Sequence, residues 1–234
     1  MKIITHLQSQ ELYIIIPVFD HDEHLKEIIQ TLTGKGYKNI IVVNDGSEKD
    51  IFKQISEFNI HYLHHRQNLG QGAALQTGFD YAAGLDAEFV VTFDADGQHD
   101  PNDLPVVLAP VVAGRADVSL GSRFLSSQPT NIPFSKKLLL QTARFFNFLF
   151  TGLMLTDAHN GLRALNRKAL NKIRITENRM AHATEILVEA KKHHLLIEEV
   201  PVTIHYTDYS IKHGQSSWNS LRIFIDLVFY KLFS

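Results

Sequence analysis

The sequence predicts an α/β fold in which helices cover both faces of a mostly parallel β-sheet. Over the first 120 residues, short apolar runs typical of buried strands alternate with segments of helical periodicity. Hydrophobic residues make up 44% of the 234-residue chain, enough to bury a sizeable core. A chain of this length suits one such domain, or one domain with a short appendage.

The first strand and helix have the clearest local signals. The run Leu12–Pro17 (LYIIIP) is short, apolar and branched, and a proline ends it, as expected of a buried strand. Asp22–Leu32 then repeats its apolar residues at helical spacing. The remaining strands of this half are expected at Asn39–Val43, His61–His64, Glu88–Phe93 and Asp117–Leu120. The remaining helices are expected after the turn Asp45–Ser47, at Gly70–Ala83 and at Pro101–Val112.

After Leu120 the alternation of strands and helices stops. We expect helices at Lys136–Leu155 and Ala181–His194, extended chain at Ile197–Tyr206, and a last helix at Ser220–Phe233.

Composition narrows the class of protein. The formal net charge is −2, whereas duplex-binding proteins usually carry a basic excess, so nucleic acid is not expected as a partner. The absence of cysteine excludes disulfides and thiolate metal sites. Met1–Glu11 does not resemble a signal peptide. The longest apolar stretch, Leu138–Leu155, contains Arg144 and is not expected to span a bilayer.

Three polar turns fall at or near the ends of predicted strands. They are Asn44–Ser47, Asn68–Gly72 and Asp94–Asp96. In open parallel sheets, ligands bind beyond the carboxyl ends of the strands. We therefore expect these turns to converge on a ligand site.

The turn with two acids predicts a metal site. Asp94 and Asp96 are two residues apart, so in extended chain their side chains share a face, where the carboxylates repel unless a proton or cation intervenes. A hard divalent cation suits this oxygen-rich set, to which Gln98 can add a carbonyl, and Mg²⁺ or Mn²⁺ fits. The alternative is a solvated acidic turn that caps the next helix.

The other two turns allow two interpretations each. Asp45 can accept hydrogen bonds from a nucleotide base or ribose, or Asp45 or Ser47 can cap a helix. Gly70 and Gly72 let backbone approach a ligand, with free amides at the start of a helix for phosphate or sugar oxygens. The alternative there is an ordinary turn before a helix.

Taken in order, these motifs resemble family 2 glycosyltransferases of the Rossmann-like GT-A fold. The likeness is greatest to the branch of dolichol-phosphate mannose synthase and bacterial polyprenyl-phosphate glycosyltransferases. The motifs are IIIPVFD at 14–20, VVNDGS at 42–47, NLGQGAAL at 68–75, DADGQHDP at 94–101, GSRF at 121–124, TDAHNGLRAL at 156–165, EEVPV at 198–202 and YSIKHGQS at 209–216.

The resemblance implies an inverting, metal-dependent transfer of a sugar from a nucleotide diphosphate sugar, with UDP or GDP as the nucleotide. The acceptor would be a polyprenyl phosphate or a membrane-linked glycan. It implies one domain at 1–216, in which 1–120 binds the nucleotide sugar and 121–216 the acceptor, followed by an amphipathic helix at 217–234.

The resemblance also implies roles for individual residues. Donor-binding residues would be Pro17, Phe19, Asp45, Ser47, Asn68, Gly70, Gly72, Asp94 and Asp96. Metal ligands would be Asp94, Asp96 and Gln98. Acceptor-binding residues would be Arg123, Lys136, Glu185 and Lys212. Catalytic residues would be Asp96, Asp157 and Arg163, with Arg123 and Arg163 meeting phosphate groups.

The chain departs from that branch at several positions. His21, Gln71, Leu140 and His205 stand where glutamate, lysine, serine and arginine are frequent. The acceptor also decides whether a base is needed. A sugar hydroxyl must lose a proton, for which Asp157 is the candidate base, whereas a lipid phosphate is already an anion and needs cationic positioning.

The two helices expected at 136–155 and 220–233 are amphipathic, with broad aromatic faces. Each would pack on the domain or on a second copy of the chain, or would lie in the bilayer interface. Beside a lipid acceptor, we expect contact with a membrane, a partner membrane protein or a homodimer partner. The expected location is cytoplasmic, at the inner face of the membrane.

Two other functions were weighed. A sugar nucleotidyltransferase would carry a glycine-rich basic signature after the first strand, where this chain reads VFDHDEHL. A non-catalytic module that binds nucleotide sugar, or that assists a membrane partner, would not need the pair Asp94 and Asp96.

Overall fold

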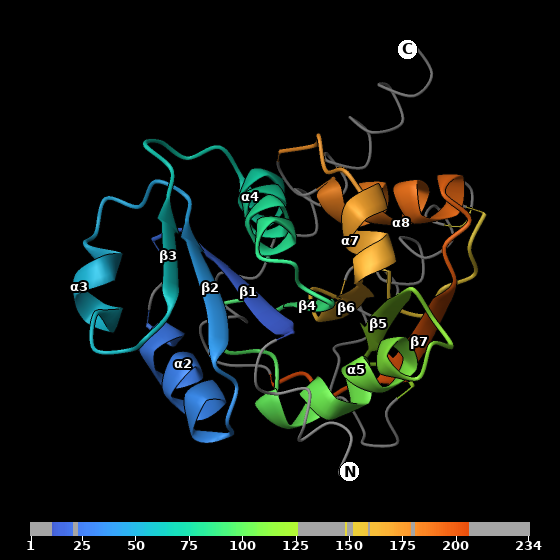
Figure 1. Cartoon of the computed structure of the whole chain (residues 1–234), viewed down its shortest axis with the longest axis horizontal. Coiled ribbons are helices and arrows are strands. Elements are labelled where there is room, and N and C mark those ends of the chain that lie inside the picture. The colour runs from blue at the N-terminus through green and yellow to red at the C-terminus, as the bar shows by residue number, and fades with distance from the viewer. Residues whose placement is uncertain are drawn as a thin grey trace, which may run out of the picture.

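The computed structural model describes residues 11–20, 23–125, 148, 152–158, 160–178 and 181–205. Within these ranges, helices cover both faces of a seven-stranded sheet with strand order β3-β2-β1-β4-β6-β5-β7 (Figure 1). Among these strands, β6 runs antiparallel to both of its neighbours, and the other pairs are parallel. The predicted α/β class and mostly parallel sheet are confirmed.

The strands predicted in the first half are all present. The described strands are β1 (Leu12–Val18), β2 (Asn39–Asn44), β3 (His61–His64), β4 (Phe89–Thr92), β5 (Val118–Ser122), β6 (Arg163–Asn166) and β7 (Ile197–Pro201). Strand β7 is shorter than the extended segment predicted at Ile197–Tyr206. Strand β6 was not predicted, because its four residues RALN are short and polar at both ends.

The described helices are α2 (Leu25–Gly34), α3 (Ile51–Ile55), α4 (Gln71–Gly84), the 3₁₀ turn η1 (Pro101–Asp103), α5 (Leu104–Val112), α7 (Arg167–Lys172) and α8 (His182–Lys192). Helix α3 begins later than the turn at Asp45 predicted, because Asp50 is its N-cap and accepts a hydrogen bond from the amide of Lys53. The alternative of Asp45 as a helix cap is therefore wrong. Helix α7, only six residues long, was not predicted.

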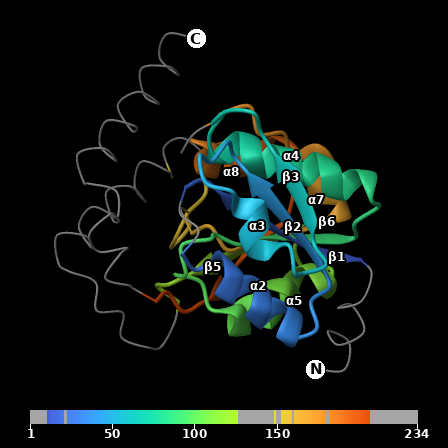
Figure 2. The same ribbon diagram turned by 90° about the vertical axis from the view of Figure 1, so that its left-hand side faces the viewer.

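The helices divide between the two faces of the sheet, as Figures 1 and 2 show together. Helices α2 and α5 cover one face, and α4, α7 and α8 cover the other. Successive residues of β1 follow this division, with Ile14 and Ile16 in the core under α2 and Ile15 in the core under α4. Burial on both faces explains why β1 is apolar without alternation.

The helix expected at Lys136–Leu155 lies mostly outside the described residues, and the one at Ser220–Phe233 lies wholly outside them. The predicted end of the first of these two helices, at Leu155, is wrong, because residues 152–155 are not helical and Gly152 has a φ of +67°. Within the described part of the chain, no helix has the length and hydropathy needed to cross a bilayer.

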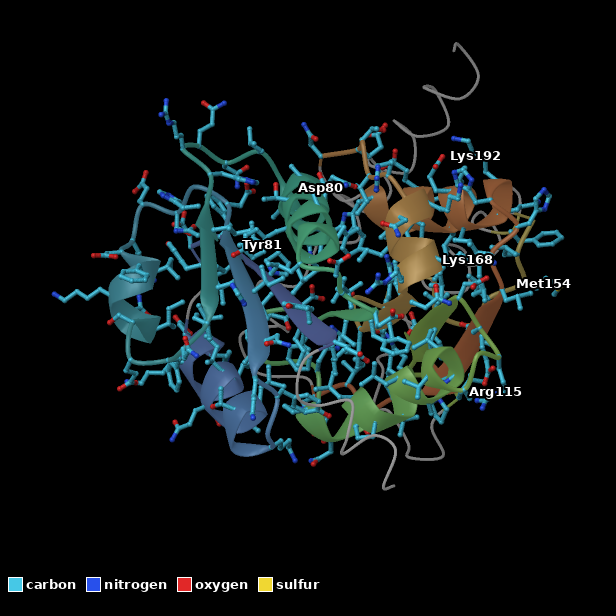
Figure 3. All side chains as sticks on the ribbon, in the orientation of Figure 1. Asp80, Tyr81, Arg115, Met154, Lys168 and Lys192 are labelled. Atoms are coloured by element: carbon cyan, nitrogen blue, oxygen red, sulfur yellow. The ribbon has the colours of Figure 1, made fainter. Side chains whose placement is uncertain are left out.

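Asp117 joins three elements on the side of the sheet that α7 covers. Its carboxylate accepts hydrogen bonds from Nζ of Lys168 on α7 at 2.9 Å, from the amide of Leu196 at 2.9 Å, and from Nδ2 of Asn166 at 3.0 Å. Figure 3 labels Lys168 on this helix. Burial raises the pKa of Asp117, but these hydrogen bonds and the charge of Lys168 outweigh it and leave the pKa below its ordinary value.

We expect Asp117→Asn to lower the free energy of unfolding at pH 7 by about 1–2 kcal/mol, through loss of charge-assisted hydrogen bonds. Because the folded pKa is depressed, this stabilisation is present above the unfolded value of about 3.9 and is lost as pH falls through the folded value. Urea unfolding of both proteins at several pH values should show the difference shrinking below about pH 4. Arg115→Gln, at an exposed ion pair with Glu198, is the control and should change little.

Candidate active site

The carboxyl ends of β1, β2 and β4 meet at one edge of the sheet. In the parallel register, Val18 pairs with Asn44, and Ile15 pairs with Thr92. The segments that follow these strands therefore lie together, which brings the Asp45 turn and the Asp94 turn to the same edge. This is the convergence that the sequence predicted.

Asp94 follows β4 and is fixed from several sides. Its Oδ1 accepts a hydrogen bond from Nε2 of Gln71 at 2.9 Å, and its Oδ2 lies 3.1 Å from Nε2 of His99. The backbone at Gly161 packs directly against it, because a Cβ built there would lie 2.0 Å from Oδ2. The carbonyl of Gly161 is itself held by Oγ1 of Thr92 at 2.5 Å.

Asp96 stands in the turn that follows, where Gly97 adopts a φ of +74°. Its carboxylate accepts hydrogen bonds from the amide of Gln98 at 3.0 Å and from Nε2 of Gln98 at 2.7 Å. The prediction that Asp94 and Asp96 share the face of an extended strand is wrong in its geometry, since Asp96 lies in a turn beyond β4. The two carboxylates nevertheless interact electrostatically.

The pKa values of the two acids move in opposite directions. Burial raises the pKa of Asp94, but the hydrogen bond and charge of His99, with the charges of His182 and Arg163, lower it below its ordinary value. Burial, and then the charge of Asp94, raise the pKa of Asp96. Asp96 is therefore the acid whose negative charge is less well compensated within the chain.

The donor set fits a cation that is shared with a bound ligand. Among the described residues, no group of three or more His, Cys, Asp or Glu side chains could hold a metal ion. Mg²⁺ in phosphate-transfer sites is commonly bound by one or two carboxylates together with phosphate oxygens. Asp94 and Asp96 supply such a partial set. The amide group of Gln98 presents Nε2 to Asp96, so its predicted carbonyl contact with a metal stays a prediction.

A second cluster of charges lies beside Asp94, formed by Arg123 after β5, Asp157 before β6, and Arg163 at the start of β6. Asp157 is 4% exposed, and its Oδ2 accepts hydrogen bonds from Nε of Arg123 at 2.6 Å and from the amide of Arg123 at 3.1 Å. Arg163 is 2% exposed and donates to the carbonyls of Asn160 and Ala158. Burial lowers the pKa of Arg163 to about 10, against the charges of Asp94 and Asp157, so it remains a cation at neutral pH.

Asp157 and Arg163, which were predicted to be catalytic, are buried in this cluster. The guanidinium of Arg163 donates hydrogen bonds to the carbonyls of residues 158 and 160, and its contact with a phosphate stays a prediction. Asp157 forms an ion pair with Arg123. Both roles, base for Asp157 and phosphate ligand for Arg123, stay predictions.

The backbone amides at the start of α4 bond to another segment of the chain, around residues 177 and 178. The amides of Gly72 and Ala73 donate to the carbonyl of Asn178 at 2.8 Å and 3.4 Å, and a Cβ on Gly72 would lie 2.0 Å from the carbonyl oxygen of Glu177. The prediction of free amides here is therefore wrong for these two residues. Glu185, predicted to face the acceptor, accepts hydrogen bonds from the amides of Thr176 and Glu177 in this same segment.

The predicted residues around the first two strands lie close together. Pro17 is buried within β1, and Phe19 beyond it is 40% exposed. Oγ of Ser47 accepts a hydrogen bond from the amide of Asp20, which joins the ends of β1 and β2. Asp45 is buried against residues 65–70, among them Asn68 and Gly70. Lys136 and Lys212 lie outside the described residues.

Sequence reasoning gave no role to His99, Gln71, Gly161 and Glu199. The first three surround Asp94, as described above, and Glu199 on β7 accepts hydrogen bonds from the amides of Thr156 and Asp157. His99 stands inside the acidic motif and Gly161 inside TDAHNGLRAL, so both lay in segments that the sequence singled out. Glu199 stands inside the motif EEVPV at 198–202, although nothing in that motif indicated its hydrogen bonds to residues 156 and 157.

The chain is similar in sequence to a known family and to known proteins. Residues 13–174 match the family model described as glycosyl transferase family 2. The chain is 33% identical over 241 residues to a UDP-N-acetylglucosamine–dolichyl-phosphate N-acetylglucosaminyltransferase of Methanococcus voltae, covering 94% of this chain and 96% of the relative. It is 28% identical over 225 residues to a polyprenol monophosphomannose synthase of Mycolicibacterium smegmatis, covering 92% and 84% respectively.

The fold is similar to the crystal structure of glucosyl-3-phosphoglycerate synthase from Mycobacterium tuberculosis in complex with Mn²⁺, UDP and glucosyl-3-phosphoglycerate. The TM-score is 0.72, with 14% sequence identity, and the match covers 95% of this chain and 82% of that one. At this identity the likeness shows the fold alone.

Proposed function

The chain belongs to glycosyl transferase family 2, and from that membership we propose that it transfers a sugar from a nucleotide diphosphate sugar to a polyprenyl phosphate, with a divalent cation as cofactor. The observation that carries the proposal is the pair of carboxylates, Asp94 and Asp96, beyond the carboxyl end of β4, where burial and then the negative charge of Asp94 raise the pKa of Asp96. A bound Mg²⁺ or Mn²⁺ would neutralise this charge and that of the departing nucleotide diphosphate.

Different residues would bind the cation and orient its ligands. Asp94 and Asp96 would hold the cation, while Gln71 and His99 keep the Asp94 carboxylate oriented. UDP and GDP are both candidate nucleotides. Inversion at the anomeric carbon would follow from direct attack by the acceptor on the face opposite the leaving diphosphate.

The burial of Asp157 and its ion pair with Arg123 favour a phosphate acceptor over a sugar hydroxyl. A hydroxyl needs a base within hydrogen-bond reach, but Asp157 is buried and already paired with Arg123. A lipid phosphate is an anion and needs no base. The relatives named for dolichyl-phosphate and polyprenol substrates support the same choice. Such an acceptor would place the enzyme at the inner face of a membrane, with membrane or homodimer contacts as further proposals.

We expect metal-dependent transfer with a strict preference for a phosphorylated lipid. Purified protein would be incubated with radiolabelled UDP- and GDP-sugars, detergent-dispersed polyprenyl phosphate, and either Mn²⁺, Mg²⁺ or EDTA. Label should enter the lipid only with a cation, and polyprenol of the same chain length should accept no sugar. Transfer to polyprenol at the same rate would contradict the acceptor assignment, and transfer undiminished in EDTA would contradict the metal assignment.

A further inference from the structure

The carboxylate of Glu199 on β7 holds the backbone of the segment that leads into β6. The amide of Thr156 donates to both carboxylate oxygens at 2.8 Å, and the amide of Asp157 donates to Oε1 at 2.9 Å. The hydroxyl of Thr156 also donates to Oε1, at 2.9 Å. One side chain therefore accepts hydrogen bonds from three donor groups on two consecutive residues.

These bonds matter because the segment has no regular secondary structure of its own. Residues 152–158 belong to no helix or strand. Leu155 and Ala158 are buried in the same core as α4, so packing fixes the positions on either side of Thr156 and Asp157. Between those positions, Glu199 is the acceptor for both amides, and hydrogen bonds to a charged group are stronger than those between neutral groups.

The same segment is joined to the end of β5. Strand β7 lies beside β5 in the sheet, and the register pairs Glu199 with Leu120 (Figure 1). Ser122, two residues further along β5, has its hydroxyl 2.6 Å from that of Thr156 and accepts a hydrogen bond from the amide of Phe124 at 3.2 Å. Because the Thr156 hydroxyl donates to Glu199, the Ser122 hydroxyl is the donor between the two. A chain of hydrogen bonds therefore runs from Glu199 to the backbone of Phe124.

Arg123 lies between Ser122 and Phe124 and is bound to the same segment through Asp157. The amide of Arg123 donates to Oδ2 of Asp157 at 3.1 Å, and its Nε donates to the same oxygen at 2.6 Å. Asp157 is thus held at its backbone by Glu199 and at its carboxylate by Arg123. Loss of the charge on Glu199 would release the backbone of Asp157 and change the direction in which Arg123 presents its guanidinium.

We propose that Glu199 is a positioning residue for the acceptor side of the site. It fixes the backbone of residues 156–157 and, through Asp157, the guanidinium of Arg123, which would meet the phosphate of the acceptor. The attachment concerns the chain alone, whereas its effect on the acceptor rests on the proposed function.

Hydrogen exchange tests the attachment without any ligand. We expect Glu199→Gln to speed amide exchange in a peptide covering residues 155–158 by about tenfold, because the amides of Thr156 and Asp157 lose a charged acceptor. Exchange in a peptide covering residues 120–125 should rise by a smaller factor, because the amide of Arg123 donates to Asp157. Unchanged exchange in either peptide would overturn the proposal.

Two milder variants keep the attachment testable if Glu199→Gln does not fold. Glu199→Asp keeps the charge but is shorter by one methylene group. Thr156→Val removes the hydroxyl bonds to Glu199 and Ser122 while it keeps the backbone amide. Both should speed exchange in the two peptides, and wild-type exchange rates in both variants would overturn the proposal.

Kinetics separate the positioning of the acceptor site from a general loss of structure. With Mn²⁺ and a labelled nucleotide sugar, we expect Glu199→Gln to raise the KM for detergent-dispersed polyprenyl phosphate by about tenfold. The dissociation constants of UDP and GDP, measured with Mn²⁺ by calorimetry, should keep their wild-type values, because Gln71 and His99, which hold Asp94, lie outside the attached segment. A wild-type KM, or equal weakening of acceptor and nucleotide, would contradict the positioning role.

The matched control is Glu198→Gln, one residue earlier on β7, where the carboxylate forms an exposed ion pair with Arg115. Exchange in both peptides and the KM for polyprenyl phosphate should keep their wild-type values in this variant. If the wild type transfers no sugar to polyprenyl phosphate, the proposed function fails, whereas the exchange measurements still decide whether Glu199 positions Arg123.

Discussion

Asp96→Asn should reduce sugar transfer by about a thousandfold while leaving the protein folded. The substitution keeps the shape of the side chain but removes one of the two negative charges that would hold the cation. The amide of Gln98 can still donate to the new side chain, so the turn keeps its hydrogen bond. The rate of metal-dependent transfer, measured at saturating donor, gives the result.

The thermal stability of Asp96→Asn provides a second test of the metal assignment. Burial and the charge of Asp94 raise the pKa of Asp96 above its unfolded value, so the ionised form costs stability at neutral pH. Asp96→Asn should therefore have a Tm equal to or above that of the wild type, and should lose the stabilisation that Mn²⁺ gives. Asp80→Asn, on the exposed surface of α4, is the matched control and should keep both activity and the response to Mn²⁺ (Figure 3). Full activity in Asp96→Asn would disprove the metal assignment.

Gly161→Ala should reduce transfer by about a hundredfold, because it displaces a group that would bind the cation. The added Cβ would lie 2.0 Å from Oδ2 and 2.7 Å from Cγ of Asp94, closer than unbonded atoms can come. Relief requires Asp94 to rotate away from His99 and Gln71, or the segment before β6 to move. Either change alters the position of the carboxylate.

Steady-state kinetics with varied Mn²⁺ measures this effect, and the cation concentration for half-maximal rate should rise together with the fall in kcat. Gly84→Ala is the matched control, since no atom lies within 4 Å of a Cβ built at Gly84. A Gly161→Ala enzyme with wild-type dependence on Mn²⁺ would show that the contact with Asp94 does not matter for the reaction.

The sequence was sufficient for β1, β2 and β4 because these strands are mainly apolar on both faces. Each contains a run of two to four consecutive Ile or Val residues, as expected of strands that are buried under helices on both sides. Strand β6 and helix α7 carry no comparable pattern. Strand β6 is placed by its pairing with β4 and β5, which local periodicity does not record, and α7 follows it directly.

The sequence predicted the part of the candidate site that follows from strand order, namely that the acids after β2 and β4 lie at the same end of the sheet. Acids that follow β2 and β4 must meet at one edge if both strands neighbour β1, and they do. The partners of those acids were not predictable, because they come from distant positions in the chain. Asp45 is held by residues 20 to 25 positions away, and Asp157 by Arg123 at a separation of 34. From residue type alone, Asp45 and Asp157 were expected to contact ligands, but in the fold their carboxylates form hydrogen bonds within the chain.

The position of β6 has a consequence for the order in which the chain can fold during synthesis. Strand β5 leaves the ribosome some 40 residues before β6, yet β6 must enter between β4 and β5 to complete the sheet. Until then, the backbone amides and carbonyls along one side of β4 have no strand to pair with. We therefore expect a nascent chain that ends before residue 163 to expose this edge and to bind chaperones or aggregate, so that the two halves reach their native state together.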